Sequence, residues 1–201
     1  AVGKMCGFYA GIFEDRRKNP RDDLPTALVN AVINGEPIGQ VELFSWGIIL
    51  MTAGHETTQS MFGLGVHALM QHPEQLQKLR ANPQLLPGAI EELLRFVSPA
   101  VHFIRTPDRD VEVGGRKIRA GEHMVMFYPS ANRDAEVFTD PDRLDIERSP
   151  NRHLAFGTGP HVCLGMHLAR LELKVMFEQF LQRVEQIEVA GEPERVYGIP
   201  T

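Results

Sequence analysis

The spacing of apolar and polar residues along the chain indicates a mainly helical protein. Apolar residues recur with a helical period through most of the first half and again near the C-terminus. The Asn34-Gly35 pair is expected to close the second helix, and Ser98-Pro99 to end the fifth. The expected helices cover residues 8–18, 24–34, 41–70, 73–80, 87–97 and 164–184.

The pattern changes in the middle of the chain and predicts a small β region. Residues 111–113 and 116–119 flank Gly114-Gly115 and predict a hairpin, and residues 124–128 predict a buried strand. Residues 131–150 are rich in Asn, Asp, Arg and Pro without a clear period, so we expect a long structured loop there. The expected fold class is therefore mainly α with a small β region.

Residues 41–70 are apolar on almost all sides of the expected helix. Such a helix is normally buried all round, unlike an amphipathic surface helix, so we expect it to run through the centre of the protein. Its longest uncharged apolar stretch, residues 43–54, has twelve positions, whereas a membrane span needs about 18. No membrane span is expected.

The composition is that of an average soluble domain and excludes several classes of function. The 201 residues are 43% hydrophobic and 23% charged, which argues against a disordered or fibrous chain. A formal net charge of -5 lacks the strong basic footprint of a nucleic-acid binder. The charged start of the chain does not resemble a signal peptide, and two cysteines do not make a disulfide framework. A reducing, cytoplasmic setting is expected.

The segment Phe156-Gly157-Thr158-Gly159-Pro160-His161-Val162-Cys163-Leu164-Gly165 carries the most specific chemistry. Its glycines let the backbone approach a flat ligand closely. Cys163 is expected where this loop meets the N-terminus of the last helix, and the amides and dipole of a helix start favour thiolate over thiol. A thiolate so placed is a suitable axial ligand for haem iron, because it donates electron density to the metal. His161 could hydrogen-bond a haem propionate.

Two other interpretations of this loop remain open. A lone cysteine in a cytosolic protein is usually a small buried hydrophobe, and glycines in a loop usually mark a turn. His161, Cys163 and His167 have a spacing that could supply part of a metal site, which would define a small metal-binding domain. That interpretation leaves the proline and the glycines of the loop unexplained.

A second chemical segment, Ala53-Gly54-His55-Glu56-Thr57-Thr58, lies within the long apolar helix. A glutamate and hydroxyls are costly to bury unless they are hydrogen-bonded. The helical period places Glu56 and Thr57 on one face with Ile49, Ala53 and Ser60, and small residues there let a flat cofactor or O2 lie against the backbone. Thr57 could donate to the Ala53 carbonyl, which would open the helix locally, so that Glu56 and Thr57 relay protons. The alternative is a helix in which Glu56 simply reaches solvent.

Together these segments resemble the cytochrome P-450 family. The cysteine segment matches every specified position of the family's haem-binding loop, and residues 53–57 resemble its oxygen-activation motif, Ala/Gly-Gly-x-Asp/Glu-Thr. The resemblance implies haem b (iron protoporphyrin IX) with Cys163 as the thiolate ligand, and Glu56 and Thr57 as catalytic residues. The other cofactor contacts that it implies are His161, Arg105, Phe156, Gly157, Gly165, Ala53 and Gly54.

Glu92-Leu93-Leu94-Arg95 places a glutamate and an arginine on one turn of a helix. Such a pair is usually exposed and contributes only about 0.2–0.5 kcal/mol. Here it resembles the family's Glu-x-x-Arg helix, in which the pair holds the loop before the haem ligand together with a loop arginine. Arg143 is the expected third member, with Arg148 as the rival. These residues would be structural.

The resemblance also implies roles for the segment Val101-His102-Phe103-Ile104-Arg105. In the family an arginine at the place of Arg105 bonds a haem propionate, and the residues before it line the substrate pocket. By this match Val101 and Phe103 are expected to contact substrate, with Ile49 and Thr52 adding to an apolar wall. The alternative for Arg105 is a surface arginine on a strand.

The resemblance covers nearly all of residues 1–201 but corresponds to a partial catalytic domain, with the N-terminal half absent. The expected fold is the C-terminal half of the cytochrome P450 fold: long central helix, Glu-x-x-Arg helix, cysteine loop and final helix. Residues 128–134 and 149–154 are most similar to soluble bacterial members that hydroxylate terpenes and related lipids.

The implied activity is a haem-thiolate monooxygenase that inserts one atom of O2 into a C–H bond of a lipophilic small molecule, terpenoid or steroid-like. The implied partners are that substrate, O2, and a ferredoxin-type electron donor with its reductase. The alternative is a catalytically inactive fragment that binds haem or self-associates, as a homo-oligomer through exposed apolar helices.

Overall fold

The computed structural model describes residues 2–191 and divides the chain into two compact units. Unit 1 runs to Glu56 and unit 2 begins at Thr57, so that the boundary falls within the longest helix. The helices are α1 (Val2–Lys18), α2 (Leu24–Val29), α3 (Gln40–Gln71), α4 (Pro73–Ala81), α5 (Leu86–Val97), α6 (Tyr128–Ala131) and α7 (Met166–Arg183), with 3-10 turns η1 (Pro83–Leu85) and η2 (Gly159–His161). The strands are β1 (Val32–Ile33), β2 (Glu36–Pro37), β3 (His102–Arg105), β4 (Val111–Val113), β5 (Arg116–Ile118) and β6 (Met124–Phe127). A mainly helical fold with a small β region is confirmed.

Unit 1 packs α1, α2 and the β1–β2 hairpin against the start of α3 around Phe13, Ile38 and Leu43. The prediction of one helix over residues 24–34 was wrong, because α2 ends at Val29. Asn34 and Gly35 instead form the turn of the β1–β2 hairpin, with φ angles of 54° and 88°. Asn-Gly is the preferred two-residue hairpin turn, since both of its residues tolerate positive φ.

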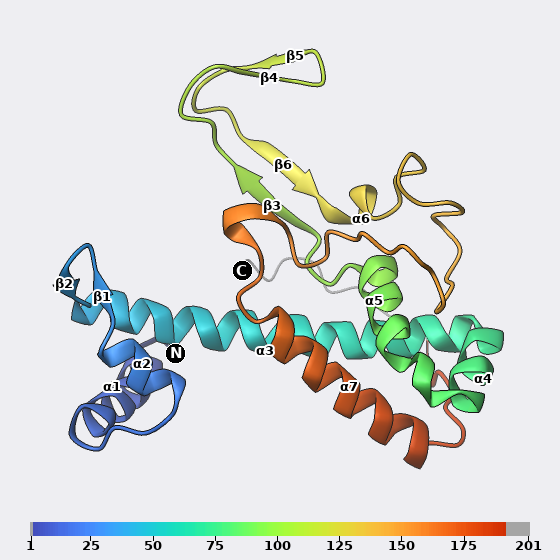
Figure 1. Cartoon of the computed structure of the whole chain (residues 1–201), viewed down its shortest axis with the longest axis horizontal. Coiled ribbons are helices and arrows are strands. Elements are labelled where there is room, and N and C mark those ends of the chain that lie inside the picture. Colours follow the sequence, from blue (N-terminus) through green and yellow to red (C-terminus); the bar gives the residue numbers. More distant parts are fainter. Residues whose placement is uncertain (1, 192–201) are drawn as a thin grey trace. The chain divides into compact units, whose positions relative to one another are not determined.

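The core of unit 2 lies between the second part of α3 and helices α4, α5 and α7 (Figure 1). Gly65 on α3 permits a close approach to α7, because a Cβ atom there would lie 3.0 Å from Cζ of Phe177. The largest apolar side chains that are almost fully buried in this core are Met61, Leu69, Leu79, Leu86, Leu93, Leu144, Ile146, Leu173 and Phe177.

The β region of unit 2 consists of two antiparallel pairs, β3 with β6 and β4 with β5. The β4–β5 hairpin is confirmed. The strand over residues 124–128 exists as β6, but the prediction that it is buried was wrong: Val125 is 59% and Phe127 51% exposed. A two-stranded sheet can pack only one of its faces, so alternate side chains of β6 remain open to solvent.

The long helix is confirmed as α3, whereas the expectation that it is buried on all sides was wrong. Buried side chains occur near its two ends, at Leu43 and between Met61 and Leu69. Between these ends residues 51–57 are exposed. A helix is enclosed only where other elements cover it, and the described residues cover only parts of α3. None of the helices within residues 2–191 is both long and apolar enough to span a bilayer.

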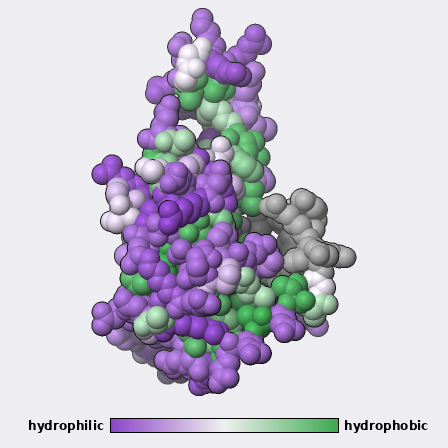
Figure 2. Space-filling model, turned by 90° about the vertical axis from the view of Figure 1, so that its right-hand side faces the viewer, coloured by the Kyte–Doolittle hydropathy of each residue, from purple (hydrophilic) through white to green (hydrophobic). Residues whose placement is uncertain are grey.

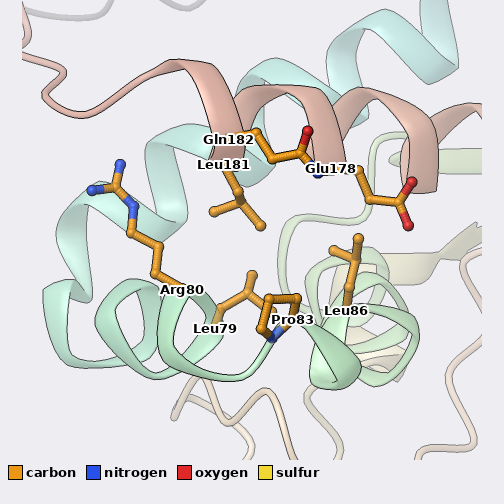
Figure 3. Close-up of a pocket in the computed structure, with 7 residues that line it drawn as sticks. All are labelled: Leu79, Arg80, Pro83, Leu86, Glu178, Leu181 and Gln182. Carbon is orange, nitrogen blue, oxygen red and sulfur yellow. The ribbon is translucent and has the colours of Figure 1, made fainter.

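A cavity of about 240 Å³ lies between α4, η1, the start of α5 and α7 (Figure 3). Leu79, Leu86 and Leu181 point into it, while the Arg80 guanidinium reaches away to the carbonyls of Val184 and Glu185. Arg80 thereby fixes the end of α7 against α4. The predicted site residues do not contribute to the lining, so this cavity belongs to the packing of the helices.

Candidate functional site

The cysteine loop is a closed backbone structure between residue 153 and α7. The Cys163 N–H donates to the Phe156 carbonyl at 2.8 Å, and the Gly157 N–H donates to the Leu154 carbonyl at 2.8 Å. Gly157 and Gly159 both have a φ of 67°, a conformation that glycine adopts without strain. The glycines and these hydrogen bonds therefore hold the loop in one conformation, in which the backbones of Phe156 and Cys163 are joined.

Cys163 is exposed, two residues before the N-cap of α7 at Gly165. The final helix was predicted from residue 164 and begins at Met166. Because the thiol is exposed, its interpretation as a small buried hydrophobe was wrong. The metal site of His161, Cys163 and His167 is also unsupported, since no cluster of three potential ligands occurs among the described residues.

The surroundings of Cys163 fit a flat apolar cofactor. Its neighbours Val162 and Leu164 are 44% and 74% exposed, although both are apolar. The glycine at 165 has open space where a Cβ atom would lie. One accessible sulfur with apolar flanks is a donor set that suits the axial position of haem iron.

Glu92 is the centre of a buried polar cluster that joins α5 to the long loop before Cys163. Its carboxylate accepts from Arg95 Nε at 2.7 Å and Nη2 at 2.8 Å, and both side chains are fully buried. It also accepts from the Asp145 N–H at 2.9 Å and from Asn151 Nδ2 at 3.0 Å. The pair of Glu92 and Arg95 is therefore buried and not exposed as such pairs usually are. The negative charge of Glu92 compensates the donors that are buried with it.

The third member of this cluster is Arg148, so the assignment of this role to Arg143 was wrong. Arg148 Nε lies 3.1 Å from both carboxylate oxygens of Glu92. Arg143 is exposed and takes part through its backbone carbonyl, which accepts from Arg95 and Arg148 at 3.0 Å. Both arginines lie in the long loop over residues 131–150, and the sequence pattern did not show which side chain reaches Glu92.

Asn132 is a buried polar residue whose role the sequence analysis missed. Its Nδ2 donates to Ser98 Oγ at 2.8 Å, and its Oδ1 accepts from the Leu154 N–H at 2.7 Å. Its carbonyl accepts from Arg95 Nη1 at 2.8 Å. Asn132 thus connects the end of α5 to the start of the cysteine loop. The only signal in the sequence was its place in the family-like segment 128–134.

A second cluster that the sequence analysis missed lies beside the cysteine loop. Glu91 accepts from His153 Nε2 at 3.0 Å and from Arg170 Nε and Nη2 at 2.7 and 2.8 Å. Burial by itself would raise the pKa of Glu91, but the hydrogen bonds from Arg170 and His153 outweigh it and lower the pKa to about 2. The carboxylate is therefore ionised at neutral pH.

Residues predicted to contact substrate and a haem propionate lie on β3 and just before it. Phe103 is 52% exposed and its ring packs edge-on against Tyr128, with centroids 5.9 Å apart. Arg105 is paired with Met124 of β6 and is half-buried, while its Nη1 donates to the Ile104 carbonyl at 3.0 Å. Val101 precedes β3 and accepts from the Tyr128 N–H at 3.0 Å. An exposed aromatic and a cationic side chain on one short strand are compatible with the predicted roles.

The predicted residues of the central helix lie on the exposed part of α3. Ile49, Thr52, Ala53, Gly54 and Glu56 belong to unit 1, whereas Thr57 and Cys163 belong to unit 2. Gly54 has open space where a Cβ atom would lie, which leaves room for a bound group. Thr52 Oγ1 donates to the Ile48 carbonyl at 3.0 Å. The proton-relay and substrate roles of these residues stay predictions.

Comparison with known proteins identifies the family. Residues 1–195 match the family model described as Cytochrome P450. Relatives include Cytochrome P450-terp from a Pseudomonas species, which is 42% identical with 97% of this chain and 46% of that protein covered. Linalool 8-monooxygenase from Pseudomonas putida is 39% identical with 96% and 48% covered. CYP109E1 from Bacillus megaterium, crystallised with testosterone, superposes with a TM-score of 0.92 at 36% identity, covering 98% of this chain and 56% of that one.

The chain belongs to the cytochrome P450 family, as the match to the family model and the relatives establish. Members of this family carry haem with a cysteine thiolate ligand. The chain spans about half the length of the curated relatives that it matches.

Proposed function

We propose that the chain is the haem-thiolate half of a cytochrome P450 monooxygenase and that Cys163 is its iron ligand. The observation that carries the proposal is the exposed thiol of Cys163, held by the 2.8 Å hydrogen bond from its N–H to Phe156 and flanked by exposed apolar residues. When bound, haem with such a ligand supplies the reductive activation of O2 that hydroxylation of an unactivated C–H bond requires.

The chain's own residues would hold the cofactor from several sides. Phe156, Gly157 and Gly165 of the cysteine loop would contact the cofactor, and Ala53 and Gly54 of α3 are the further contacts that the family resemblance implies. His161 and Arg105 would bind the propionates, because a histidine and a guanidinium are suitable donors to carboxylates. This assignment rests on the motif matches. Ala53, Gly54, His161 and Gly165 are exposed, whereas Arg105, Phe156 and Gly157 are half-buried.

Catalysis would further require protons, a substrate and electrons. The Glu56 carboxylate and the Thr57 hydroxyl would pass two protons inward from solvent as O2 is split, one oxygen atom entering the substrate and the other leaving as water. Ile49, Thr52, Val101 and Phe103 would contact the substrate.

The substrate class, the electron donor and the location are further parts of the proposal. The lipophilic substrate, terpenoid or steroid-like, is suggested by relatives such as Linalool 8-monooxygenase and by the testosterone complex of CYP109E1. A ferredoxin-type donor with its reductase would supply the two electrons. Two unpaired cysteines, Cys6 and Cys163, suit a reducing cytoplasm.

Haem reconstitution with paired cysteine variants tests the assignment of Cys163. The chain is mixed with haem, reduced and exposed to carbon monoxide, and a thiolate ligand gives a strongly red-shifted Soret band. We expect this band in the wild type and in C6A, and its loss in C163A. Folded wild-type protein without the band, or C163A with it, would contradict the proposal.

The alternative is an inactive module that binds haem or self-associates. It is favoured by a set of exposed apolar side chains along α7. Coupled substrate turnover by the haem-loaded chain would rule it out.

A further inference from the structure

The side chain of Phe156 is enclosed by groups that share one carboxylate. The Arg170 guanidinium lies over its ring, 4.6 Å from the centroid, and the His153 ring lies 6.1 Å away on a tilted plane. Both of these side chains donate to Glu91 of α5. One acidic residue therefore holds a cation and an imidazole against the same aromatic ring.

The backbone of Phe156 in turn holds Cys163, since its carbonyl accepts the Cys163 N–H at 2.8 Å. The ring of Phe156 is half-buried and packs against the core of unit 2. A rotation of this residue would move its carbonyl and with it the anchor of the cysteine. The hydrogen bonds from Arg170 to Glu91 raise the pKa of the guanidinium, so Arg170 stays charged beside the Phe156 ring.

We propose that Glu91, His153 and Arg170 form a positioning cluster that fixes Phe156 and, through its carbonyl, the place of Cys163. The cluster joins three separate parts of unit 2: α5, the loop that enters the cysteine segment, and α7, which follows it. These are positioning residues, because they act through Phe156. Groups that do not touch a metal often orient the residue that binds it, and this cluster would do the same for Cys163. The proposal therefore rests on the proposed function.

Amide hydrogen exchange of the full chain tests the cluster without any cofactor. In R170Q and E91Q we expect faster exchange in the peptide over residues 156–164, which reports the Cys163 N–H. R170K retains the charge but lacks the planar fork, so it should recover part of the protection. K174Q is the matched control, since it removes only the surface pair of Lys174 with Glu178, 3.8 Å apart on the same helix. It should leave this peptide unchanged.

Amides of α3 in residues 61–71 serve as the internal reference for overall stability. Faster exchange confined to residues 156–164 supports the cluster. Equal exchange in R170Q and wild type, or equal acceleration throughout unit 2, overturns it. If R170Q does not fold, H153F and R170K are compared in the same way.

Thiol reactivity and haem binding separate this proposal from the proposed function. In a C6S background Cys163 is the only thiol, and we expect its alkylation to be faster in R170Q than in K174Q. In the haem-loaded chain we expect R170Q to lose about 10- to 100-fold in haem affinity, the usual effect of removing an outer-shell partner. If the wild type takes up no haem while R170Q still exchanges faster than wild type in residues 156–164, the proposed function is contradicted and the positioning cluster is still supported.

Discussion

Glu92 shows how a single buried charge organises a long loop. Two arginines, an asparagine and a backbone amide all donate to its carboxylate. Each of these donors would be costly to bury alone, and the charge of Glu92 compensates them together. The loop before the cysteine segment therefore has a defined conformation although it contains little regular secondary structure.

Alanine substitutions distinguish Arg143 from Arg148 as the third member of this cluster. R148A removes a guanidinium that is 3.1 Å from both oxygens of Glu92 and only 10% exposed, so we expect a loss of about 3 kcal/mol in the free energy of unfolding. R143A removes an exposed side chain and should change that free energy by less than about 0.5 kcal/mol. Urea unfolding of both variants measures the difference. Equal losses would contradict the assignment of Arg148.

Glu91 predicts a specific dependence of stability on pH. The pKa of the Glu91 carboxyl is about 2 in the folded chain, against an ordinary value of 4.5. As the pH falls, Glu91 therefore takes up a proton in the unfolded chain before it does so in the folded chain. The stabilisation by Glu91 is therefore complete above about pH 4.5 and is lost as the pH falls towards 2. We expect the difference in unfolding free energy between wild type and E91Q to be constant at neutral pH and to shrink over this range. A constant difference down to the lowest pH would refute this account.

At the scale of elements, the contact of α3 with α7 depends on the absence of one side chain. A Cβ atom at Gly65 would lie 3.0 Å from Phe177, whereas at Gly63 it would meet nothing within 4 Å. Because both glycines are in the same helix, alanine should gain helix propensity at either position. The crowding exists only at residue 65.

The pair G63A and G65A therefore tests the packing of these two helices. G63A should raise the free energy of unfolding by about 1 kcal/mol, the usual gain of alanine over glycine in a helix. G65A should fall about 1–3 kcal/mol below G63A, because the added methyl group overpacks the contact with Phe177. Thermal or urea unfolding gives both values. A G65A variant as stable as G63A would show that the two helices can separate without loss.

Helices with a clear period and marked ends could be predicted from the sequence, whereas contacts distant in the sequence could not. The periodic stretches became α3, α4, α5 and α7 with ends within about two residues of those expected, whereas α1 ends at Lys18 as predicted but already begins at Val2. In contrast, the choice of Arg148 depends on a contact 56 residues away in the sequence, and the pair of Glu91 and Arg170 spans 79. Only the folded chain brings such residues together. The pattern also could not show that α2 ends early, because the Asn-Gly turn is a local preference that competes with the helix.

At the scale of the whole molecule, the exposed apolar surface bears on how the chain associates. Figure 2 shows hydrophobic residues at the surface among mostly hydrophilic ones. Along α7 and just before it, apolar side chains recur at intervals of four, three and four residues, and between 49% and 74% of each is exposed. We name this set the α7 stripe: Leu164, Leu168, Leu171 and Val175. The opposite side of α7 contributes Leu173 and Phe177 to the core.

The α7 stripe predicts that the 201-residue chain self-associates in solution. Leucines at this spacing form a continuous apolar seam along a helix, and contiguous apolar surface of this kind drives association in water. Replacing Leu168 and Leu171 with glutamate places two charges in the seam without touching the core, so the sedimentation coefficient should shift to that of a monomer. V137E is the control, since Val137 is 55% exposed but lies outside the stripe. Association that persists in the L168E/L171E chain, or that V137E abolishes equally, would assign the contact to another surface.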